Sequence, residues 1–164
     1  MARAHEQRTT MSLARETEMT AGELDEFLGG QETGVLSLAR DDEPYAIPIS
    51  YGYDPDERVF YLRLVSTPES EKREYLSSSP RARLVVYDEN HAASTYQSVV
   101  AVGSLTEVPP EALTVDRIEQ YGEAKRPLFE IWANSKPDLD IQLYTLEPVD
   151  LSGRRTVIDR DESE

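Results

Sequence analysis

The sequence predicts a mainly β protein, a small antiparallel barrel of six strands with peripheral helices. Short segments alternate between bulky apolar residues and small or polar residues, which is typical of strands buried on one face. Polar turns such as Asp41-Asp42-Glu43 separate neighbouring segments, so consecutive strands are expected to pair as hairpins. The helical segments are short and lie between hairpins, which favours a closed or half-open antiparallel barrel.

The N-terminal half predicts one helix and three strands. Thr20 and Glu23 form a capping box at the start of the helix, and Gly29 and Gly30 end it. The apolar residues on its buried face are Leu24, Phe27 and Leu28. The three strands are expected over residues 34–40, 44–53 and 58–65.

The C-terminal half predicts further short helices and three more strands. Thr67 is the N-cap of a helix that runs to about residue 77 and stops before Pro80. A second helix is expected from Pro109 to about residue 121, and a third around residues 128–133. The strands are expected over residues 81–88, 97–108 and 141–146. Gly103 predicts a bulge or a bend within the fifth strand.

The chain of 164 residues fits one domain with loose ends. We expect a mobile N-terminal arm over residues 1–18, a barrel domain over residues 19–155 and an acidic tail over residues 156–164. The first residues have no apolar run and do not resemble a secretory signal, and no segment is apolar enough to span a bilayer.

Composition narrows the classes of partner. A formal net charge of −15 repels phosphate backbones and anionic membranes, so we expect neither nucleic acid nor a membrane as a partner. The chain contains no cysteine, which excludes disulfides and thiolate sites and is compatible with a cytoplasmic location. Lysine occurs only at Lys72, Lys125 and Lys136. An acidic surface with so little lysine indicates adaptation to a salty cytoplasm, and an ordinary acidic surface is the alternative.

The second predicted strand has one bulky face and one nearly bare face. Its bulky residues are Tyr45, Ile47, Ile49, Tyr51 and Tyr53, and its small residues are Ala46, Pro48, Ser50 and Gly52. A surface without protruding side chains suits a flat aromatic ring, and close packing by another element is the alternative. Because Pro48 cannot donate to a ladder, we expect the sheet to be interrupted or at an edge there.

The segment after the third predicted strand has features of a phosphate site. A helix N-terminus presents free N–H groups, and here the hydroxyls of Ser66, Thr67 and Ser70 lie beside it. Lys72 adds a full positive charge about one turn into the helix. A plain capped helix with Lys72 paired to a nearby glutamate is the alternative.

Other site classes find little support. The histidines are His5, in the expected arm, and His91, in a polar loop. Neither has the neighbours that a metal site needs. Ser94 lies close to His91 in sequence, but no Gly-x-Ser-x-Gly elbow surrounds it, so a hydrolase is not expected.

In order and spacing, several motifs resemble the pyridoxamine 5′-phosphate oxidase-like family, the FMN-binding split barrels. They are Gly-Val-Leu-Ser-Leu-Ala from Gly34, Glu-Pro-Tyr-Ala-Ile-Pro-Ile-Ser-Tyr-Gly-Tyr-Asp from Glu43, Arg-Val-Phe-Tyr-Leu from Arg58, Ser-x-Lys-x-x-x-Leu-x-x-x-Pro from Ser70, Arg-Ala-Arg-Leu-Val-Val from Arg81, Tyr-Gln-Ser-Val-Val-Ala-Val-Gly from Tyr96 and Gln-Leu-Tyr-Thr-Leu-Glu-Pro-Val-Asp-Leu-Ser-Gly-Arg from Gln142. The resemblance covers roughly residues 20–155.

The resemblance implies a homodimer with FMN at the subunit interface. The residues that would contact the cofactor are Tyr45, Ala46, Ile47, Pro48, Ile49, Ser50, Tyr61, Leu62, Ser66, Thr67, Ser70, Lys72, Gln97, Ser98 and Trp132. Of these, Ser70 and Lys72 would hold the phosphate, and Gln97 and Ser98 would approach from the second protomer. Trp132 would cover the ring, or else be buried at the interface.

The sequence departs from the true oxidases of the family at several of these positions. Tyr45 and Ser50 replace an Arg and a Lys on the second strand, and Glu71 replaces the Arg beside Lys72. These departures argue against pyridoxamine phosphate as the substrate. We expect an oxidoreductase that passes hydride or electrons from a reduced nicotinamide to a small organic acceptor. The alternatives are a deazaflavin-dependent reductase and a non-catalytic flavin-binding or assembly protein.

Overall fold

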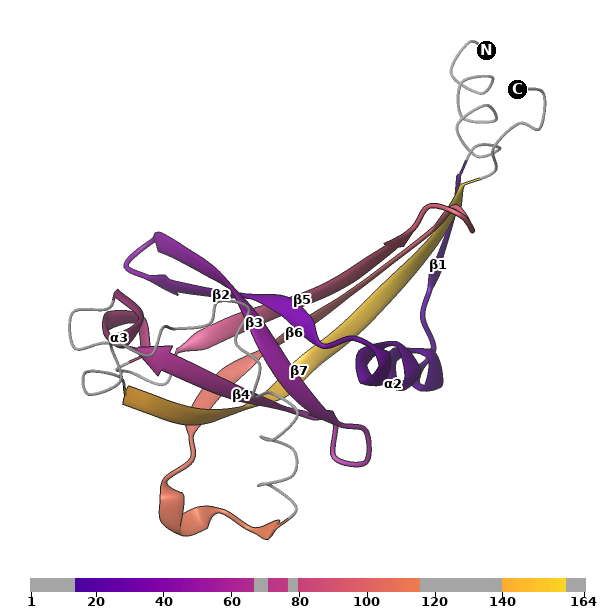
Figure 1. Ribbon diagram of the computed structural model, residues 1–164. Helices are drawn as coiled ribbons and strands as arrows, with labels where there is room; N and C mark the ends of the chain where they lie inside the picture. Colours follow the sequence, from indigo (N-terminus) through magenta and orange to yellow (C-terminus); the bar gives the residue numbers. More distant parts are fainter. Residues whose placement is uncertain (1–13, 67–70, 77–79, 116–139, 159–164) are drawn as a thin grey trace.

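The computed structural model describes residues 14–66, 71–76, 80–115 and 140–158. Seven strands form one antiparallel sheet in the order β1-β7-β4-β3-β2-β5-β6. A further pairing of β6 with β7 closes the six strands other than β1 into a barrel (Figure 1). The predicted fold class, a six-stranded antiparallel barrel with peripheral helices, is therefore confirmed.

Each strand expected from the sequence overlaps a strand of the structure. The strands are β1 (Ala14–Glu18), β2 (Thr33–Arg40), β3 (Glu43–Asp54), β4 (Val59–Ser66), β5 (Arg81–Asn90), β6 (Thr95–Glu107) and β7 (Asp140–Ile158). The helices are α2 (Ala21–Gly30), α3 (Glu71–Leu76) and the 3-10 turn η1 (Pro110–Ala112). Of the helix expected from Pro109 to about residue 121, the structure describes the 3-10 turn η1 and a helical residue at Val115. The helix expected around residues 128–133 lies outside the described residues.

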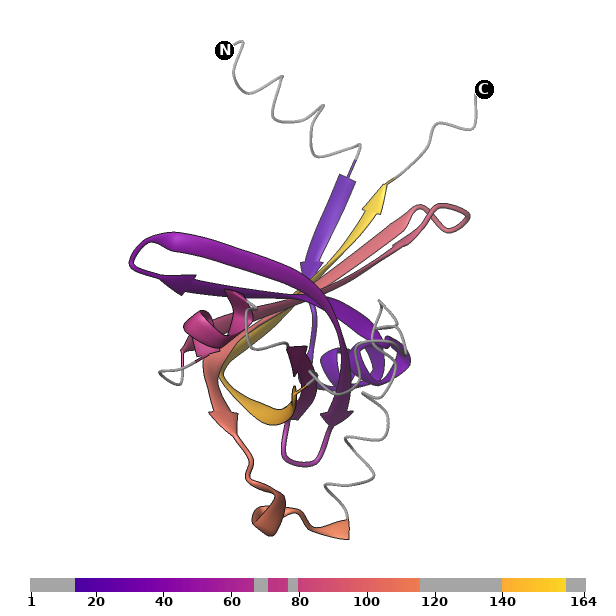
Figure 2. The same ribbon diagram turned by 60° about the vertical axis from the view of Figure 1, so that its left-hand side comes forward.

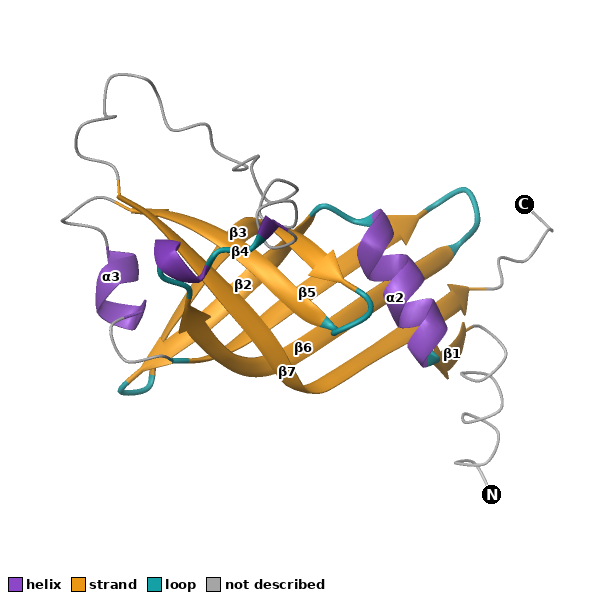
Figure 3. Cartoon of the chain, turned by 90° about the horizontal axis from the view of Figure 1, so that it is seen from below, coloured by secondary structure: helices purple, strands orange, loops and turns teal. Residues whose placement is uncertain are grey.

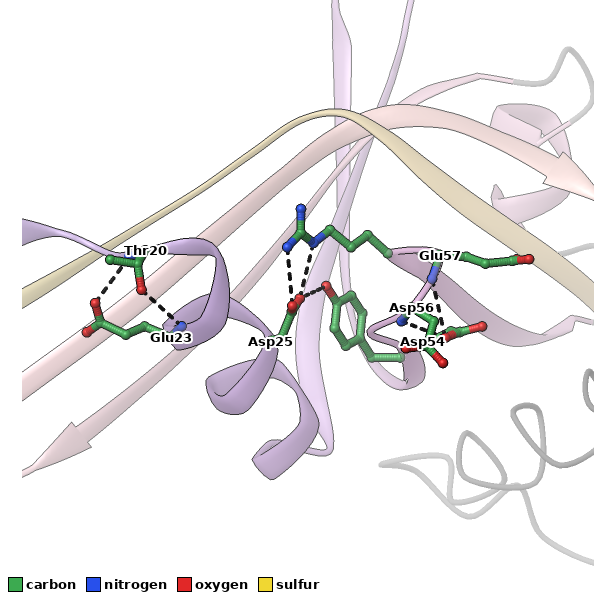
Figure 4. A network of polar contacts seen from close by, with 8 residues as sticks. Thr20, Glu23, Asp25, Asp54, Asp56 and Glu57 are labelled. Atoms are coloured by element: carbon green, nitrogen blue, oxygen red, sulfur yellow. Dashed lines mark hydrogen bonds and ion pairs between the residues drawn. The ribbon is translucent and has the colours of Figure 1, made fainter.

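Helix α2 begins where the capping box predicts. The Glu23 N–H donates to Thr20 Oγ1 at 3.3 Å, and the Thr20 N–H donates back to Glu23 Oε1 at 3.2 Å (Figure 4). The expected apolar face is buried: Leu24, Phe27 and Leu28. This face joins the main core, which the inward side chains of the strands form. Helix α2 lies at one end of the barrel, and α3 lies at the other (Figure 3).

Strand pairing extends past both bounds of the predicted barrel domain. Residues 14–18, expected in a mobile arm, form β1, and residues 156–158, expected in a tail, belong to the 19-residue strand β7. β1 pairs with the end of β7, where Arg154 Nη1 and Glu16 Oε1 form an ion pair at 2.6 Å. A strand with polar residues on both faces has no hydrophobic period, so its pairing is not visible in the sequence.

The bulge expected at Gly103 is present. The register of β6 against β7 shifts between Val102 and Gly103, which pairs with Pro148. A Cβ atom at Gly103 would overlap the Glu147 carbonyl oxygen, so a glycine is needed where the two backbones approach this closely.

Candidate functional site

The two faces of β3 differ as the sequence predicts. Ile49, Tyr51 and Tyr53 point into the barrel and are buried in the main core. Ala46 and Pro48 point outward and are exposed. Side chains alternate along a strand, so the bulky residues fill the core and leave an almost flat outer surface.

This flat surface continues from β3 onto the neighbouring strands. Ser37 of β2 pairs with Ala46, while Val35 of β2 pairs with Pro48 on one side and with Val85 of β5 on the other. Residues directly opposite in a ladder share a face, so all five side chains point outward together. We call this surface the outer strip: Val35, Ser37, Ala46, Pro48 and Val85.

The barrel is split beside the outer strip. β3 pairs with β4 only from Tyr51 to Asp54, although both strands are described in full. The edge of β3 over residues 43–50 therefore faces an opening, as expected for a strand segment that contains Pro48. Ser50 is 5% exposed and lies at the end of this opening, where the pairing of β3 with β4 begins.

Helix α3 lies at the opening between β3 and β4. Lys72 donates from Nζ to the Val65 carbonyl of β4 at 2.8 Å. Tyr75 stacks on Tyr45 of β3, with ring centroids 4.9 Å apart and planes inclined by 21°. Leu76 is buried in the main core. One face of this short helix therefore contacts both edges of the opening.

The Lys72 ammonium is half-buried, and burial lowers its pKa from the ordinary value. Its described partner is a backbone carbonyl and not the glutamate that the plain-helix alternative expects. An ammonium group has three donors, so the bond to Val65 leaves donors for a further acceptor. Thr67 and Ser70 lie outside the described residues, and Ser66 is the last residue of β4.

Two expected contact residues lie on opposite sides of β4. Leu62 is fully buried in the main core. Tyr61 is 4% exposed and packs in a second, smaller cluster with Val59 and Val108. Tyr61 pairs with Gly52 of β3, so its side chain lies on the outer face, beyond the end of the outer strip.

Gln97 and Ser98 lie far from β3 within one chain. They belong to a hairpin extension in which residues 86–90 of β5 pair with residues 95–99 of β6, beyond the last pairing of β5 with β2. The extension and the β2–β3 turn lie at opposite ends of the molecule (Figure 1). A single chain therefore does not bring Gln97 and Ser98 to the outer strip, and Trp132 lies outside the described residues.

Two arginines that sequence reasoning did not select lie beside the outer strip. Arg81 and Arg83 of β5 line a hollow of about 300 Å³ together with Ser37 and Ala39 of β2 and Val102 of β6. The available signal was the alternation Arg-Ala-Arg, which places both arginines on one face of a strand. The cross-strand register that sets Arg83 beside Ser37 is visible only in the structure.

His91 is the histidine that the structure describes. His91 Nε2 contacts Glu89 Oε2 at 3.4 Å in an exposed turn, and His5 is outside the described residues. In the part of the chain that the structure describes, no group of three or more His, Cys, Asp or Glu residues is arranged to hold a metal ion.

None of the described helices is long and apolar enough to cross a membrane.

The family is decided by a sequence comparison that covers most of the chain. The family profile for pyridoxamine 5′-phosphate oxidase matches residues 20–155. The chain belongs to the pyridoxamine 5′-phosphate oxidase-like family. A comparison with curated proteins finds no match.

Solved structures share the split-barrel fold of the pyridoxamine 5′-phosphate oxidase-like family. An FAD-binding protein from Mesorhizobium loti is 23% identical, with a TM-score of 0.62 over 87% of this chain and 98% of that chain. The FAD binding protein from Mycobacterium smegmatis is 16% identical, with a TM-score of 0.61 over 87% of this chain and 100% of that chain. An FAD and heme binding protein from the same organism is 16% identical, with a TM-score of 0.58 over 90% of this chain and 77% of that chain. At these identities the likeness shows the fold.

Proposed function

We propose that this protein binds FMN, with the flavin ring against the outer strip and the phosphate directed toward Lys72. The observation that carries the proposal is the exposed, nearly flat surface at Ala46 and Pro48, which ends at an opening containing a half-buried ammonium group. A planar ring needs the first feature, and an anionic tail is stabilised by the second. FAD is the alternative form of the cofactor, because similar folds are described as FAD-binding proteins.

We further propose that the protein is an oxidoreductase. A bound flavin supplies the redox chemistry, between a reduced nicotinamide as donor and a small organic acceptor. The residues of this chain bind and orient the cofactor. Ala46 and Pro48 leave room for the ring, and Lys72 offsets the phosphate charge. The alternative of a non-catalytic flavin carrier is favoured by Glu71, which adds a negative charge next to Lys72.

The same proposal includes a homodimer. Gln97 and Ser98 lie on the extension, at the opposite end of the molecule from the β2–β3 turn, so a second copy is needed to bring them to the outer strip. Exposed apolar side chains on β5 and β7 provide area for such an interface: Tyr87 is 60% exposed and Val149 is 70% exposed. Light scattering in concentrated KCl should give the mass of a dimer, and a monomer would argue against a shared site.

The decisive experiment is the spectrum and mass of the ligand that copurifies with the protein in concentrated KCl. A visible spectrum of oxidised flavin with the mass of FMN supports the proposal, whereas the mass of FAD or of a deazaflavin coenzyme selects an alternative. Bleaching by NADH or NADPH, with turnover of an added acceptor, supports the oxidoreductase. Bound flavin without turnover supports the carrier. A protein that neither copurifies with a flavin nor binds added FMN contradicts the proposal.

A further inference from the structure

The hollow beside Arg81 and Arg83 lies on the same outer face as the outer strip. Arg83 pairs with Ser37 of β2, which in turn pairs with Ala46 of β3. These three residues form one row across three strands, so their side chains share a face. With a volume of about 300 Å³, the hollow is at the lower end of the range for small-molecule sites.

No nearby carboxylate compensates the two arginines. Arg83 pairs with Val102 of β6, and Val102 pairs with Asp150 of β7, which is the first acidic residue in this row. Arg81 pairs with Ser104 of β6, and Ser104 pairs with Glu147 of β7. The backbones of strands two positions apart are about 10 Å apart, so neither acid is the direct cross-strand neighbour of an arginine.

The other arginines with described contacts differ in this respect. Arg58 binds Asp25, Arg154 binds Glu16 and Arg40 donates to the Glu74 carbonyl. The side chains of Arg81 and Arg83 form no hydrogen bond or ion pair with any other residue that the structure describes. In a chain with a net charge of −15, two exposed guanidinium groups without an acidic partner beside a hollow are the pattern expected of a site for an external anion.

We propose that Arg81 and Arg83 form a phosphate subsite at this hollow. They are two residues apart on one face of a strand, so their Cα atoms are about 7 Å apart and both guanidinium groups can reach one anion. Guanidinium groups bind phosphate oxygens in a bidentate manner, and the Ser37 hydroxyl lies on the row between Arg83 and the outer strip. The subsite goes beyond the proposed flavin site, because it requires neither a bound flavin nor Lys72.

Inorganic pyrophosphate is the probe that tests this subsite. Isothermal titration of the purified protein at moderate salt should show pyrophosphate binding. The double variant Arg81→Gln with Arg83→Gln should weaken it about tenfold or more, which is about 1.4 kcal/mol. Arg155→Gln removes an exposed arginine of β7 away from the hollow and should leave the affinity unchanged. A wild-type protein that does not bind pyrophosphate, or a double variant that binds it equally well, would overturn the proposal.

Two further titrations identify the source of the phosphate. If it belongs to an FAD cofactor, which has a second phosphate beyond the one directed toward Lys72, the double variant should lose affinity for FAD but keep its affinity for FMN. If it belongs to a nicotinamide donor, the double variant should lose affinity for NADPH or NADH while its FMN affinity stays unchanged. A chain that binds pyrophosphate through these arginines but takes up no flavin would contradict the proposed flavin site and leave the phosphate subsite intact.

Discussion

The ammonium group of Lys72 donates a hydrogen bond to the carbonyl of Val65 at 2.8 Å, across the opening in the barrel. This bond gives a donor to a β4 carbonyl beyond the last residue that pairs with β3. It also holds a positive charge in the opening beside the edge of β3. Lys72 therefore has a structural role in the described chain, and its proposed role toward phosphate depends on the donors that remain.

Replacing Lys72 by Met should affect both the proposed phosphate contact and the bond to Val65, and two separate measurements distinguish these effects. Lys72→Met keeps the apolar stem but removes the charge, so FMN affinity should fall about tenfold, or about 1.4 kcal/mol. Loss of the bond to Val65 should lower the free energy of unfolding by about 1 kcal/mol. Fluorescence titration with FMN and urea unfolding measure the two effects. Lys72→Arg retains the charge and should retain most of the affinity. Equal FMN affinity in the Met variant and the wild type would mean that Lys72 serves only Val65.

Filling the outer strip should block flavin without unfolding the barrel. Ala46 is exposed, so Ala46→Leu adds a side chain above the sheet and not within the core. We expect FMN binding to be lost, with a change in stability of less than about 0.5 kcal/mol, which is usual for surface positions. Ala46→Ser is the matched control, because a small side chain keeps the surface flat. If the Leu variant still binds FMN with wild-type affinity, the ring does not lie on Ala46.

The contact between α2 and β3 predicts a dependence of stability on pH. Asp25 accepts hydrogen bonds from the Tyr53 hydroxyl at 2.6 Å and from Arg58 Nη2 at 3.3 Å (Figure 4). Burial raises the pKa of Asp25, but the hydrogen bonds from Tyr53 and Arg58 outweigh burial, so the pKa lies below its ordinary value of 3.8. The contacts of ionised Asp25 therefore contribute to the free energy of unfolding when the pH is above the ordinary pKa. This contribution is lost as the pH falls through the lower pKa that Asp25 has in the folded state.

Asp25→Asn should remove this dependence. The variant should lose about 1 to 2 kcal/mol of unfolding free energy at neutral pH, because a charged acceptor is replaced by a neutral one. Its stability should also fall less steeply than that of the wild type as the solution is acidified. Denaturant unfolding at a series of pH values measures both effects. Glu26→Gln, on the exposed face of the same helix, should behave like the wild type. Parallel pH profiles for Asp25→Asn and the wild type would contradict the assignment.

The bulge in β6 predicts a large effect for a single methyl group. Gly103→Ala would place Cβ against the Glu147 carbonyl, so β6 or β7 must shift, at a cost of about 1 to 3 kcal/mol. Gly29→Ala is the control, because nothing lies within 4 Å of a Cβ at that helical position. The control should be neutral or slightly stabilising. Thermal unfolding of both variants makes the comparison, and equal midpoints would show that the bulge accommodates a side chain.

The predictable part of the fold rests on local patterns. The capping box at Thr20 and the bulky and bare faces of β3 depend on residues close together in sequence. The pairing of β1 with the end of β7 joins segments at the two ends of the sequence. With polar residues on both faces of β1, no hydrophobic period signals that pairing.

The geometry of the candidate site was predictable to a similar extent. The exposed small residues Ala46 and Pro48 follow from alternation along one strand. The hydrogen bond of Lys72 to Val65 depends on how α3 enters the split, which alternation does not encode. The position of Arg83 beside Ser37 depends on the register between β2 and β5, and a single sequence does not fix that register.

The pairing of β1 with β7 places Ala14 directly opposite Ile158. Figure 2 shows β1 and the end of β7 side by side. Backbones of paired strands lie about 5 Å apart, so a linker of a few residues could join these two positions into a continuous hairpin. New chain ends could then be opened in the exposed turn between β3 and β4 at residues 55–57. The barrel should accept such a circular permutation, because every strand pair of the sheet would be preserved.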